Sequence, residues 1–471
     1  MSELPKGWRR VPFEEAADVV RGITFPATAK SAPGTPGAVV CLRTSNVQRE
    51  LLFDDVLHVP GEYVRRDDQW LRHGDIVMSM ANSQALVGKV ALAWNPPPRT
   101  TFGGFLGVLR PRSVDPRYLH HAVRSPDVAR AIRATASQTV NIANISVRGL
   151  RDVQLPIAPL PEQRRIVAEI ETQFSRLDAA VASLQRVKVN LKRARASVLK
   201  AAVEGRLVPT EAALAKADGR AYEPAEKLLE RILEERRRRW SESGAKGRYQ
   251  QPEKPELTSL PVPEGWTWAT MPQLGELDRG KSKHRPRNDP RLLGGPYPFI
   301  QTGDVRQANG TIRIFSATYS AFGLAQSRLW PAGTLCITIA ANIAETAILG
   351  IDACFPDSVV GFSGLCAPVT VRFLEMFMRT ERRRIAEFAP ATAQKNINLQ
   401  ILRKVAAPIP PLAEQHRIVA EVERRLSVLD AVEAATDANL TRCERLRQSV
   451  LKMAFEGRLV PQDVAAERSR T

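Results

Sequence analysis

The chain repeats itself, and this internal repeat constrains the fold more than any other feature of its sequence. The segment LPEQRRIVAEIE at 160–171 returns as LAEQHRIVAEVE at 412–423, a shift of 252 residues. The same shift places SVLKAAVEGRLVP at 197–209 on SVLKMAFEGRLVP at 449–461. Internal similarity of this kind indicates that one structural unit occurs twice in the chain.

A weaker match marks the start of each unit. LPKGWRRV and VPEGWTWA place Trp8 on Trp266, at a shift of 258 residues. The sequence between this match and the helical repeat differs between the two copies, so one scaffold carries two different surfaces. We therefore predict four segments: a first domain at 1–158, a helix with a charged linker at 159–258, a second domain at 259–410 and a second helix at 411–471.

Both closely matched segments are predicted to be long helices. Their apolar residues recur at steps of three and four, which is typical of a helix that buries one seam. The first seam comprises Ile166, Ile170, Phe174, Leu177, Val181, Leu184, Leu191 and Val198. The second comprises Ile418, Val422, Leu426, Leu429, Val432, Leu440, Leu446 and Val450. Gly205 and Gly457 stand where left-handed C-terminal caps are expected.

The two seams are expected to pair with each other. A seam of this length needs a partner that removes its apolar side chains from water. Each helix leads away from its own domain, so the pair is predicted to be antiparallel. The alternative is that each helix packs only on its own domain. The predicted fold class is α+β, with two mixed α/β domains, a long antiparallel pair of helices between them and an internal pseudo-two-fold repeat.

The charge of the chain favours a polyanionic partner. The net charge is +18 and the pI is about 10.1, which makes nucleic acid the first candidate. The linker contains EPAEKLLERILEERRRRW, whose alternating charges predict one exposed helix. Its four arginines, Arg236 to Arg239, either contact DNA or a partner or, as is commoner, form a solvated face.

The sequence indicates a soluble cytosolic protein. The five cysteines form no C-x-x-C pair, and MSELPKGWRR lacks the apolar core of a signal peptide. The longest apolar stretch, at 334–351, carries Asn342 and Glu345 near its centre, which argues against a membrane span. We expect no metal site and no cofactor.

One short motif suggests ATP binding, but its surroundings argue against it. GELDRGKS, Gly275 to Ser282, fits the phosphate-binding loop pattern G-x-x-x-x-G-K-[ST]. Such a loop must open a helix, and Pro286 and Pro290 prevent one here. The stretch 279–291 carries six Lys or Arg residues and one Asp, so we predict a DNA-contacting loop. The alternative is an ordinary surface loop.

The repeated helical segments resemble those of the specificity (S) subunits of type I restriction–modification enzymes. The resemblance is carried by PLPEQRRIVAEIE, LDAAV and VLKAAVEGRLVP, by their second copies, by the L-P-x-G-W start and by the linker helix. It covers essentially the whole chain. It implies a subunit without catalytic activity, whose two target-recognition domains each read half of a bipartite, asymmetric DNA sequence.

The resemblance also implies partners. The antiparallel helices would act as a spacer between the half-sites. Two methyltransferase subunits would dock on the chain and methylate adenines, and motor-nuclease subunits would join for restriction. Two other classes remain open from the residues: a single-chain enzyme, for which we find no catalytic constellation, and a coiled-coil scaffold without a DNA role.

Candidate DNA contacts follow from the preference of Arg and Lys for guanine and of Asn and Gln for adenine. In the first domain they are Arg43, Asn46, Gln48, Asn82, Gln84, Lys89 and Asn144. In the second they are Lys281, Lys283, Arg285, Arg287, Gln301, Arg306, Gln394, Lys395 and Asn396. The segments LRTSNVQ and IQTGDVRQ align between the domains. The alternative for each residue is turn capping or support of the fold.

Overall fold

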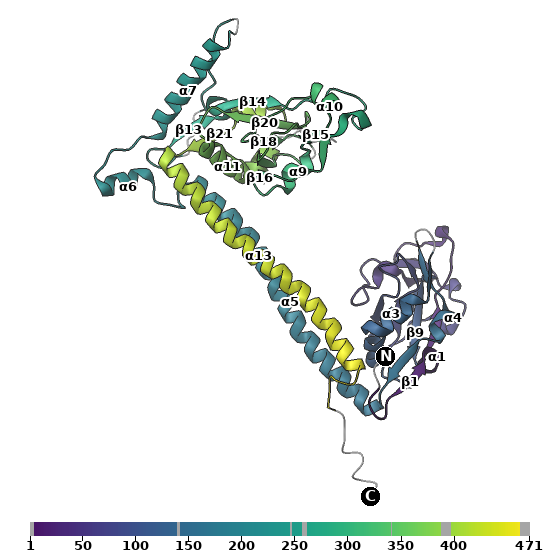
Figure 1. Cartoon of the computed structure of the whole chain (residues 1–471). Coiled ribbons are helices and arrows are strands. Elements are labelled where there is room, and N and C mark those ends of the chain that lie inside the picture. Colours follow the sequence, from purple (N-terminus) through teal and green to yellow (C-terminus); the bar gives the residue numbers. More distant parts are fainter. Residues whose placement is uncertain are drawn as a thin grey trace. The chain divides into compact units, whose positions relative to one another are not determined.

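The chain forms two compact units in its computed structural model. One unit holds residues 1–186 and 436–471, and the other holds residues 187–435. Both contain a stretch of each long helix, α5 (Leu160–Val203) and α13 (Leu412–Phe455), which Figure 1 labels. The structure describes residues 4–138, 142–244, 247–256, 261–340, 342–387 and 397–461.

The first domain is built on an antiparallel sheet in the order β2–β9–β5–β7. These strands are Ala17–Arg21, Leu106–Pro111, Ile76–Ser79 and Val90–Leu92. Every residue of β5 is buried, as expected for a short apolar run at the centre of a sheet. Two smaller sheets have the orders β4–β3–β8 and β10–β11–β6. Their strands are Leu57–Pro60, Ala38–Leu42, Thr100–Phe102, Ala136–Gln138, Ala143–Ile145 and Ala81–Asn82.

The first and last strands of this domain pair with each other. β1 (Arg9–Pro12) runs antiparallel to β12 (Gln154–Ile157), so the start of the domain lies beside the residues that lead into α5. The helices of the domain are α1 (Phe13–Ala16), α2 (Pro116–Arg124), α3 (Pro126–Ala134) and α4 (Val147–Arg151). The side chain of Asp115 caps α2 by accepting two backbone hydrogen bonds, at 2.9 and 3.2 Å.

The second domain contains a sheet in the order β14–β20–β18–β19–β16. These strands are Gly275–Arg279, Val359–Gly364, Leu335–Thr338, Thr346–Leu349 and Thr311–Ile312. Two further antiparallel pairs are β15 (Leu293–Phe299) with β17 (Ala317–Tyr319), and β13 (Thr267–Thr270) with β21 (Ala406–Ile409). Its helices are α8 (Met271–Leu274), α9 (Thr302–Gln307), α10 (Ala321–Ala325), α11 (Pro368–Glu387) and α12 (Leu399–Lys404).

The strand order shows that the repeat extends into the domain interiors. The order β2–β9–β5–β7 in the first domain corresponds to β14–β20–β18–β19 in the second. The closing pair β1–β12 likewise corresponds to β13–β21. One scaffold therefore occurs twice although the interior sequences differ, and the predicted fold class is confirmed.

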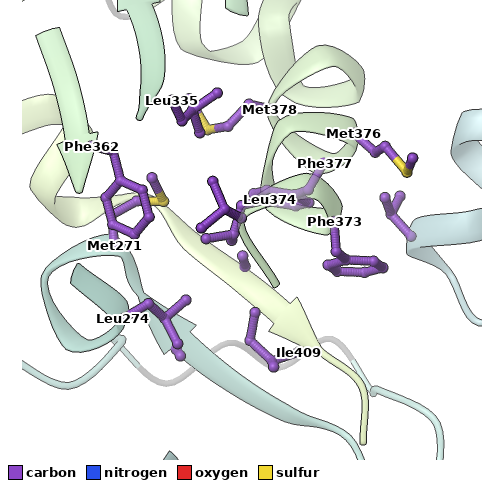
Figure 2. Close-up of a cluster of buried hydrophobic side chains, with 14 of the residues drawn as sticks. Met271, Leu274, Leu335, Phe362, Phe373, Leu374, Met376, Phe377, Met378 and Ile409 are labelled. Carbon is purple, nitrogen blue, oxygen red and sulfur yellow. The ribbon is translucent and has the colours of Figure 1, made fainter. Parts of the chain in front are cut away.

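The core of the second domain gathers around α11. Figure 2 shows Phe373, Leu374 and Phe377 of this helix among side chains from the sheet and from α8, including Phe362 and Met271. None of these five side chains is more than 4% exposed. The aromatic rings supply much of the apolar area that the domain removes from water.

The linker contains two helices, α6 (Glu211–Asp218) and α7 (Ala225–Glu242). The prediction that the charged helix is exposed is wrong for one of its faces. Ala225, Leu228 and Ile232 of α7 are buried in the core of the second domain. Their spacing of three and four residues places them on one face of the helix, which the high charge of the segment concealed.

Helices α5 and α13 lie side by side in each unit and run antiparallel (Figure 1). In the first unit Arg447 forms an ion pair with Asp178, and in the second Arg195 forms one with Asp430. From the first contact to the second, α5 advances by 17 residues while α13 steps back by 17. The helices therefore have the same antiparallel register in each unit, so the predicted pairing is confirmed within each of them.

The seam differs from the prediction at two positions of α13. Val432 and Leu446 are 40% and 43% exposed, whereas Thr436 and Cys443 are 4% and 7% exposed. Thr436 and Cys443 follow Leu429 at steps of seven residues, which is the period of paired helices. Hydropathy alone selects the larger apolar neighbours, because it does not mark a threonine as a seam residue.

Both long helices end in the predicted left-handed caps. Gly205 and Gly457 have φ angles of 68° and 70°. The N–H of Arg206 donates to the carbonyl of Ala201 at 2.8 Å, and the N–H of Arg458 makes the equivalent bond. These bonds satisfy helix carbonyls that would otherwise lack donors. A side chain at 205 would also meet Pro263, since a built Cβ lies 2.5 Å from its Cγ.

In the second unit the tryptophan of the domain start contacts the glutamate of the EQ motif, although the two motifs are distant in the sequence. Nε1 of Trp266 donates to Glu414 at 3.0 Å, and the N–H of Glu211 donates to the other oxygen of that carboxylate at 2.8 Å. Burial raises the pKa of Glu414. Its counterpart Glu162 and the indole of Trp8 are also buried, but within the described part of the first unit the indole nitrogen of Trp8 has no hydrogen-bond partner.

We predict that Trp266→Phe lowers the thermal midpoint more than Trp8→Phe does. Both changes remove the same atoms from a buried site, but only Trp266 donates to a buried carboxylate. Removal of that donor should cost about 1–3 kcal/mol beyond the loss of packing. Differential scanning calorimetry of the full chain measures both midpoints. Equal shifts would contradict a stabilising role for this bond.

Candidate nucleic-acid interface

The first candidate DNA contacts, Arg43 and Asn46, lie at a 3₁₀ turn formed by Thr44–Asn46. Asn46 is 2% exposed, and its side-chain oxygen accepts the N–H of Arg43 at 2.8 Å. Its amide nitrogen donates to the carbonyls of Leu52 and Asp55 at 3.0 and 2.9 Å. The guanidinium of Arg43 forms an ion pair with Asp55. DNA contact by Asn46 stays a prediction, and its bonds favour the alternative role of supporting the loop.

The second domain repeats this turn at α9. Oδ2 of Asp304 accepts the N–H of Gln301 at 2.8 Å, as Asn46 does in the first domain. The following valines, Val47 and Val305, are both buried. The aligned segments therefore occupy equivalent places in the two domains.

Two candidates of the second domain lie exposed at the ends of this turn. Gln301 precedes α9, and Arg306 is 64% exposed near its end. The Nε atom of Arg306 lies 3.9 Å from a carboxylate oxygen of Glu345. The candidates Gln394, Lys395 and Asn396 lie outside the described residues.

The structure brings two of the other candidates, Gln48 and Lys89, into contact. Nζ of Lys89 donates to Oε1 of Gln48 at 2.6 Å, although 41 residues separate them. β6 and β11 pair antiparallel with Asn144 opposite Ala81, so Asn82 and Asn144 belong to the same small sheet but point to opposite faces of it. Asn144 is exposed, and Asn82 is partly buried. Gln84 is exposed just beyond β6.

Sequence reasoning missed Phe105. Its ring is 67% exposed, and its carbonyl accepts the N–H groups of Met80 and Ala81 at 2.9 and 3.2 Å. It therefore lies beside the strand that carries Asn82. Apolar character alone suggests a core residue, but the adjacent Gly104 is a signal for a turn that could have indicated exposure.

The loop after β14 presents the basic candidates to solvent. All four are exposed: Lys281, Lys283, Arg285 and Arg287. Within the described chain, the two lysine ammonium groups have no ion-pair partner, whereas Arg287 pairs with Asp357 at 2.8 Å. The two lysines are thus free to meet phosphates.

Asp289 stiffens this loop. One of its oxygens lies 2.8 Å from Nε2 of His284 and 2.7 Å from a guanidinium nitrogen of Arg291. The hydrogen bonds from Arg291 are the main reason that the pKa of Asp289 is lowered, and His284 adds to the effect. The exposed lysines therefore stand on a loop with internal structure.

The phosphate-loop motif has the wrong geometry for ATP. Gly275–Arg279 is the strand β14, whose backbone pairs with β20. Ser282 is 6% exposed, and its hydroxyl lies 3.2 Å from that of Tyr319. The next described element is a 3₁₀ turn at Pro290–Leu292 and not a helix that opens at the serine. The absence of ATP binding stays a prediction, which this geometry favours.

An activated cysteine or a cluster of metal ligands among the described residues would indicate a catalytic site. Burial raises the pKa of the Cys41 thiol to about 12 and also raises that of Cys354, so neither is activated as a nucleophile. In the described part of the chain, no group of three or more His, Cys, Asp or Glu residues could hold a metal ion. No described helix combines the length and the apolar character that crossing a membrane requires.

A buried carboxylate on α11 lies beneath the loop that follows α9. Glu375 is 1% exposed, and its oxygens lie 3.8 and 3.7 Å from Arg372 and Arg379. Arg372 donates to the carbonyl of Gly310 at 2.9 Å, and Arg379 donates to Asn309 at 3.5 Å. Burial raises the pKa of Glu375 to about 7 against the attraction of both arginines.

We predict that Glu375→Gln gains stability over the parent chain as the pH rises from 5 to 8. The folded pKa of Glu375 lies above its ordinary value of 4.5, so its stabilising contribution is complete below that value and is lost as the pH rises through about 7. The variant cannot ionise there. The gain in the free energy of unfolding of the variant over the parent should approach about 3 kcal/mol, at about 1.4 kcal/mol per pKa unit. Urea unfolding at several pH values measures it, and a pH-independent difference would contradict the prediction.

Comparison with known proteins shows what the chain is similar to. Residues 263–441 match the family model described as the type I restriction modification DNA specificity domain. The chain is 25% identical to the type I restriction enzyme EcoKI specificity subunit of Escherichia coli strain K12, over 98% of this chain and 91% of that protein. It is 26% identical to the StySPI specificity subunit of Salmonella potsdam, with the same coverage of both chains.

A solved structure supports the fold. It comes from work on complex assembly and conformational transition of the type I R-M system, and it matches with a TM-score of 0.62 at 19% identity. The match covers 97% of this chain and 100% of that one. Together these findings confirm the predicted resemblance: in sequence the chain is similar to specificity subunits of type I restriction enzymes.

Proposed function

We propose that the chain is the DNA sequence-specificity subunit of a type I restriction–modification complex, without catalytic activity or a cofactor of its own. Each globular domain reads one half of a bipartite, asymmetric DNA target. The observation that carries this proposal is the repetition of one scaffold with two unlike surfaces. Identical surfaces would instead suit a palindrome.

The difference between the surfaces is chemical. The first domain carries the amides of Asn82 and Asn144 on the two faces of one small sheet, with Gln48 bonded to Lys89. The second presents a loop whose Lys281 and Lys283 are exposed and have no ion-pair partner among the described residues. Amides suit adenine, while Lys and Arg suit guanine and phosphates. We infer unlike half-sites, and the net charge of +18 supplies attraction that does not depend on sequence.

The helix pair is the proposed spacer and docking site. Each helix has 44 residues, which is about 66 Å at ~1.5 Å per residue. Two methyltransferase subunits would dock on it, and motor-nuclease subunits would join in the restricting complex. We propose a cytoplasmic location and retain the segments 1–158, 159–258, 259–410 and 411–471 as the first target-recognition domain, the first spacer helix with its linker, the second target-recognition domain and the second spacer helix.

The experiment that tests this function maps modified adenines in cells that express the chain with its neighbouring methyltransferase. We expect methylation at one split, asymmetric motif, and none at that motif when the chain is absent. Methylation that is unchanged without the chain would contradict the proposal, because the enzyme would then find its target alone.

A paired substitution tests whether the loop after β14 contacts DNA. Lys281→Gln with Lys283→Gln should reduce methylation and lower the slope of log K against log salt by about 2, at about 0.9 per phosphate contact. The matched control is Arg238→Gln with Arg239→Gln on α7, which removes the same charge from residues already paired with Glu235. Equal effects from both pairs would show that only net charge matters and would remove the loop from the interface.

A further inference from the structure

The same ion pair forms twice between the long helices. Asp178 and Asp430 occupy equivalent positions of the repeat, as do Arg195 and Arg447, at the shift of 252 residues. Arg447 pairs with Asp178 in the first unit, and Arg195 pairs with Asp430 in the second. The repeat therefore produces two related ion-pair contacts between α5 and α13.

Each of these contacts also includes a third residue, which comes from a globular domain. Arg49 follows the candidate turn of the first domain, and its two terminal nitrogens lie 2.6 and 2.7 Å from the oxygens of Asp178. Asn309 follows the equivalent turn, α9, and donates to Asp430 at 3.5 Å. Each aspartate therefore joins the other helix to the loop beside a candidate DNA-reading turn.

In each cluster the arginine of the other helix is the buried member, whereas Asp178 and Asp430 are 45% and 46% exposed. Arg447 is 5% exposed and packs against the ring of Phe174 at 5.0 Å, and Arg195 is 19% exposed. Burial tends to raise the pKa of Asp178, but bonds from Arg49 and the charge of Arg447 outweigh it and lower the pKa. A buried charge that loses its partner is costly, so each aspartate holds the buried arginine of the other helix in place.

Two neighbouring ion pairs, which also repeat between the units, serve as a comparison for the contacts of the aspartates. Glu171 pairs with Arg117 at 3.2 Å, and the equivalent Glu423 pairs with Arg372 at 3.1 Å. Each of these contacts ties a domain to the helix that follows it. The clusters around the aspartates differ because each of them also includes an arginine of the other long helix.

We propose that the clusters Arg49–Asp178–Arg447 and Asn309–Asp430–Arg195 are positioning sites that lock each DNA-reading loop to the register of the helix pair and thereby restrict the accepted gap between half-sites. This inference rests on the proposed function. The residues act through the loops and touch no DNA themselves. The first cluster is the stronger tether, because Arg49 contributes a charge where Asn309 contributes a neutral amide.

Charge reversal separates the two contacts of Asp178. Arg49→Asp breaks only the tie to the loop. Asp178→Arg with Arg447→Asp restores the contact between the helices but sets Arg49 against a like charge. Adding Arg49→Asp to that pair restores both contacts with reversed sign. The matched control is Arg424→Asp, which changes the same charge on α13 at a residue paired with Glu421 of its own helix.

The readout is methylation of a DNA library in which the two half-sites stand at every gap from short to long, with the full chain and its methyltransferase. We expect one gap for the parent and the control. Arg49→Asp and the double variant should raise methylation at neighbouring gaps roughly tenfold, a typical strength of coupling between sites. The triple variant should return to one gap.

The outcomes distinguish the inference from the function beneath it. If the parent methylates a split target and the Arg49→Asp and double variants keep its single gap, the positioning role is overturned while the proposed function stands. If the parent directs no methylation to a split target, the proposed function itself falls. Asp178→Asn keeps the volume of the side chain and is used if the charge-reversal variants fail to fold. A lower thermal midpoint with an unchanged gap would show a purely structural role and overturn the inference.

Discussion

The antiparallel register of α5 and α13 is the constraint on which both units depend. Each core takes side chains from the start of one helix and the end of the other, such as Ile166 with Leu451 in the first unit and Ile418 with Leu199 in the second. A slip of the register would expose apolar seam residues and separate the buried arginines from their aspartates. The repeat thus places both domains on equivalent supports, while each domain keeps its own exposed surface.

The paired motifs of the repeat have a physical explanation in this arrangement. The glutamine of each EQ motif reaches the helix that follows the main sheet: Gln163 accepts the N–H of Asp115 at 2.9 Å, and Gln415 accepts the hydroxyl of Thr370 at 2.6 Å. The glutamate of the second motif, Glu414, holds Trp266. The motifs are therefore attachments between domain and helix, and the DNA-reading role proposed for the chain belongs to the loops that they leave exposed.

The sequence predicted what depends on local or repeated patterns. The long helices, their glycine caps and their antiparallel pairing follow from apolar spacing and from the internal match. It did not predict the buried face of α7, the seam role of Thr436 or the burial of Asn46, because a polar residue in a well-bonded buried place looks like a surface residue. The DNA contacts stay predictions, and Arg49 was overlooked because its partner lies 129 residues away.

The most direct test of the account lengthens the helix pair. One heptad inserted near residue 187 of α5 and another near residue 438 of α13 keeps every seam residue on its face. Seven residues add about 10 Å, which corresponds to at most about 3 base pairs at ~3.4 Å per step. The gap between methylated half-sites, measured by sequencing of modified adenines, should become longer while the half-sites stay the same. An unchanged gap would contradict the account, because the helices would then not set the spacing.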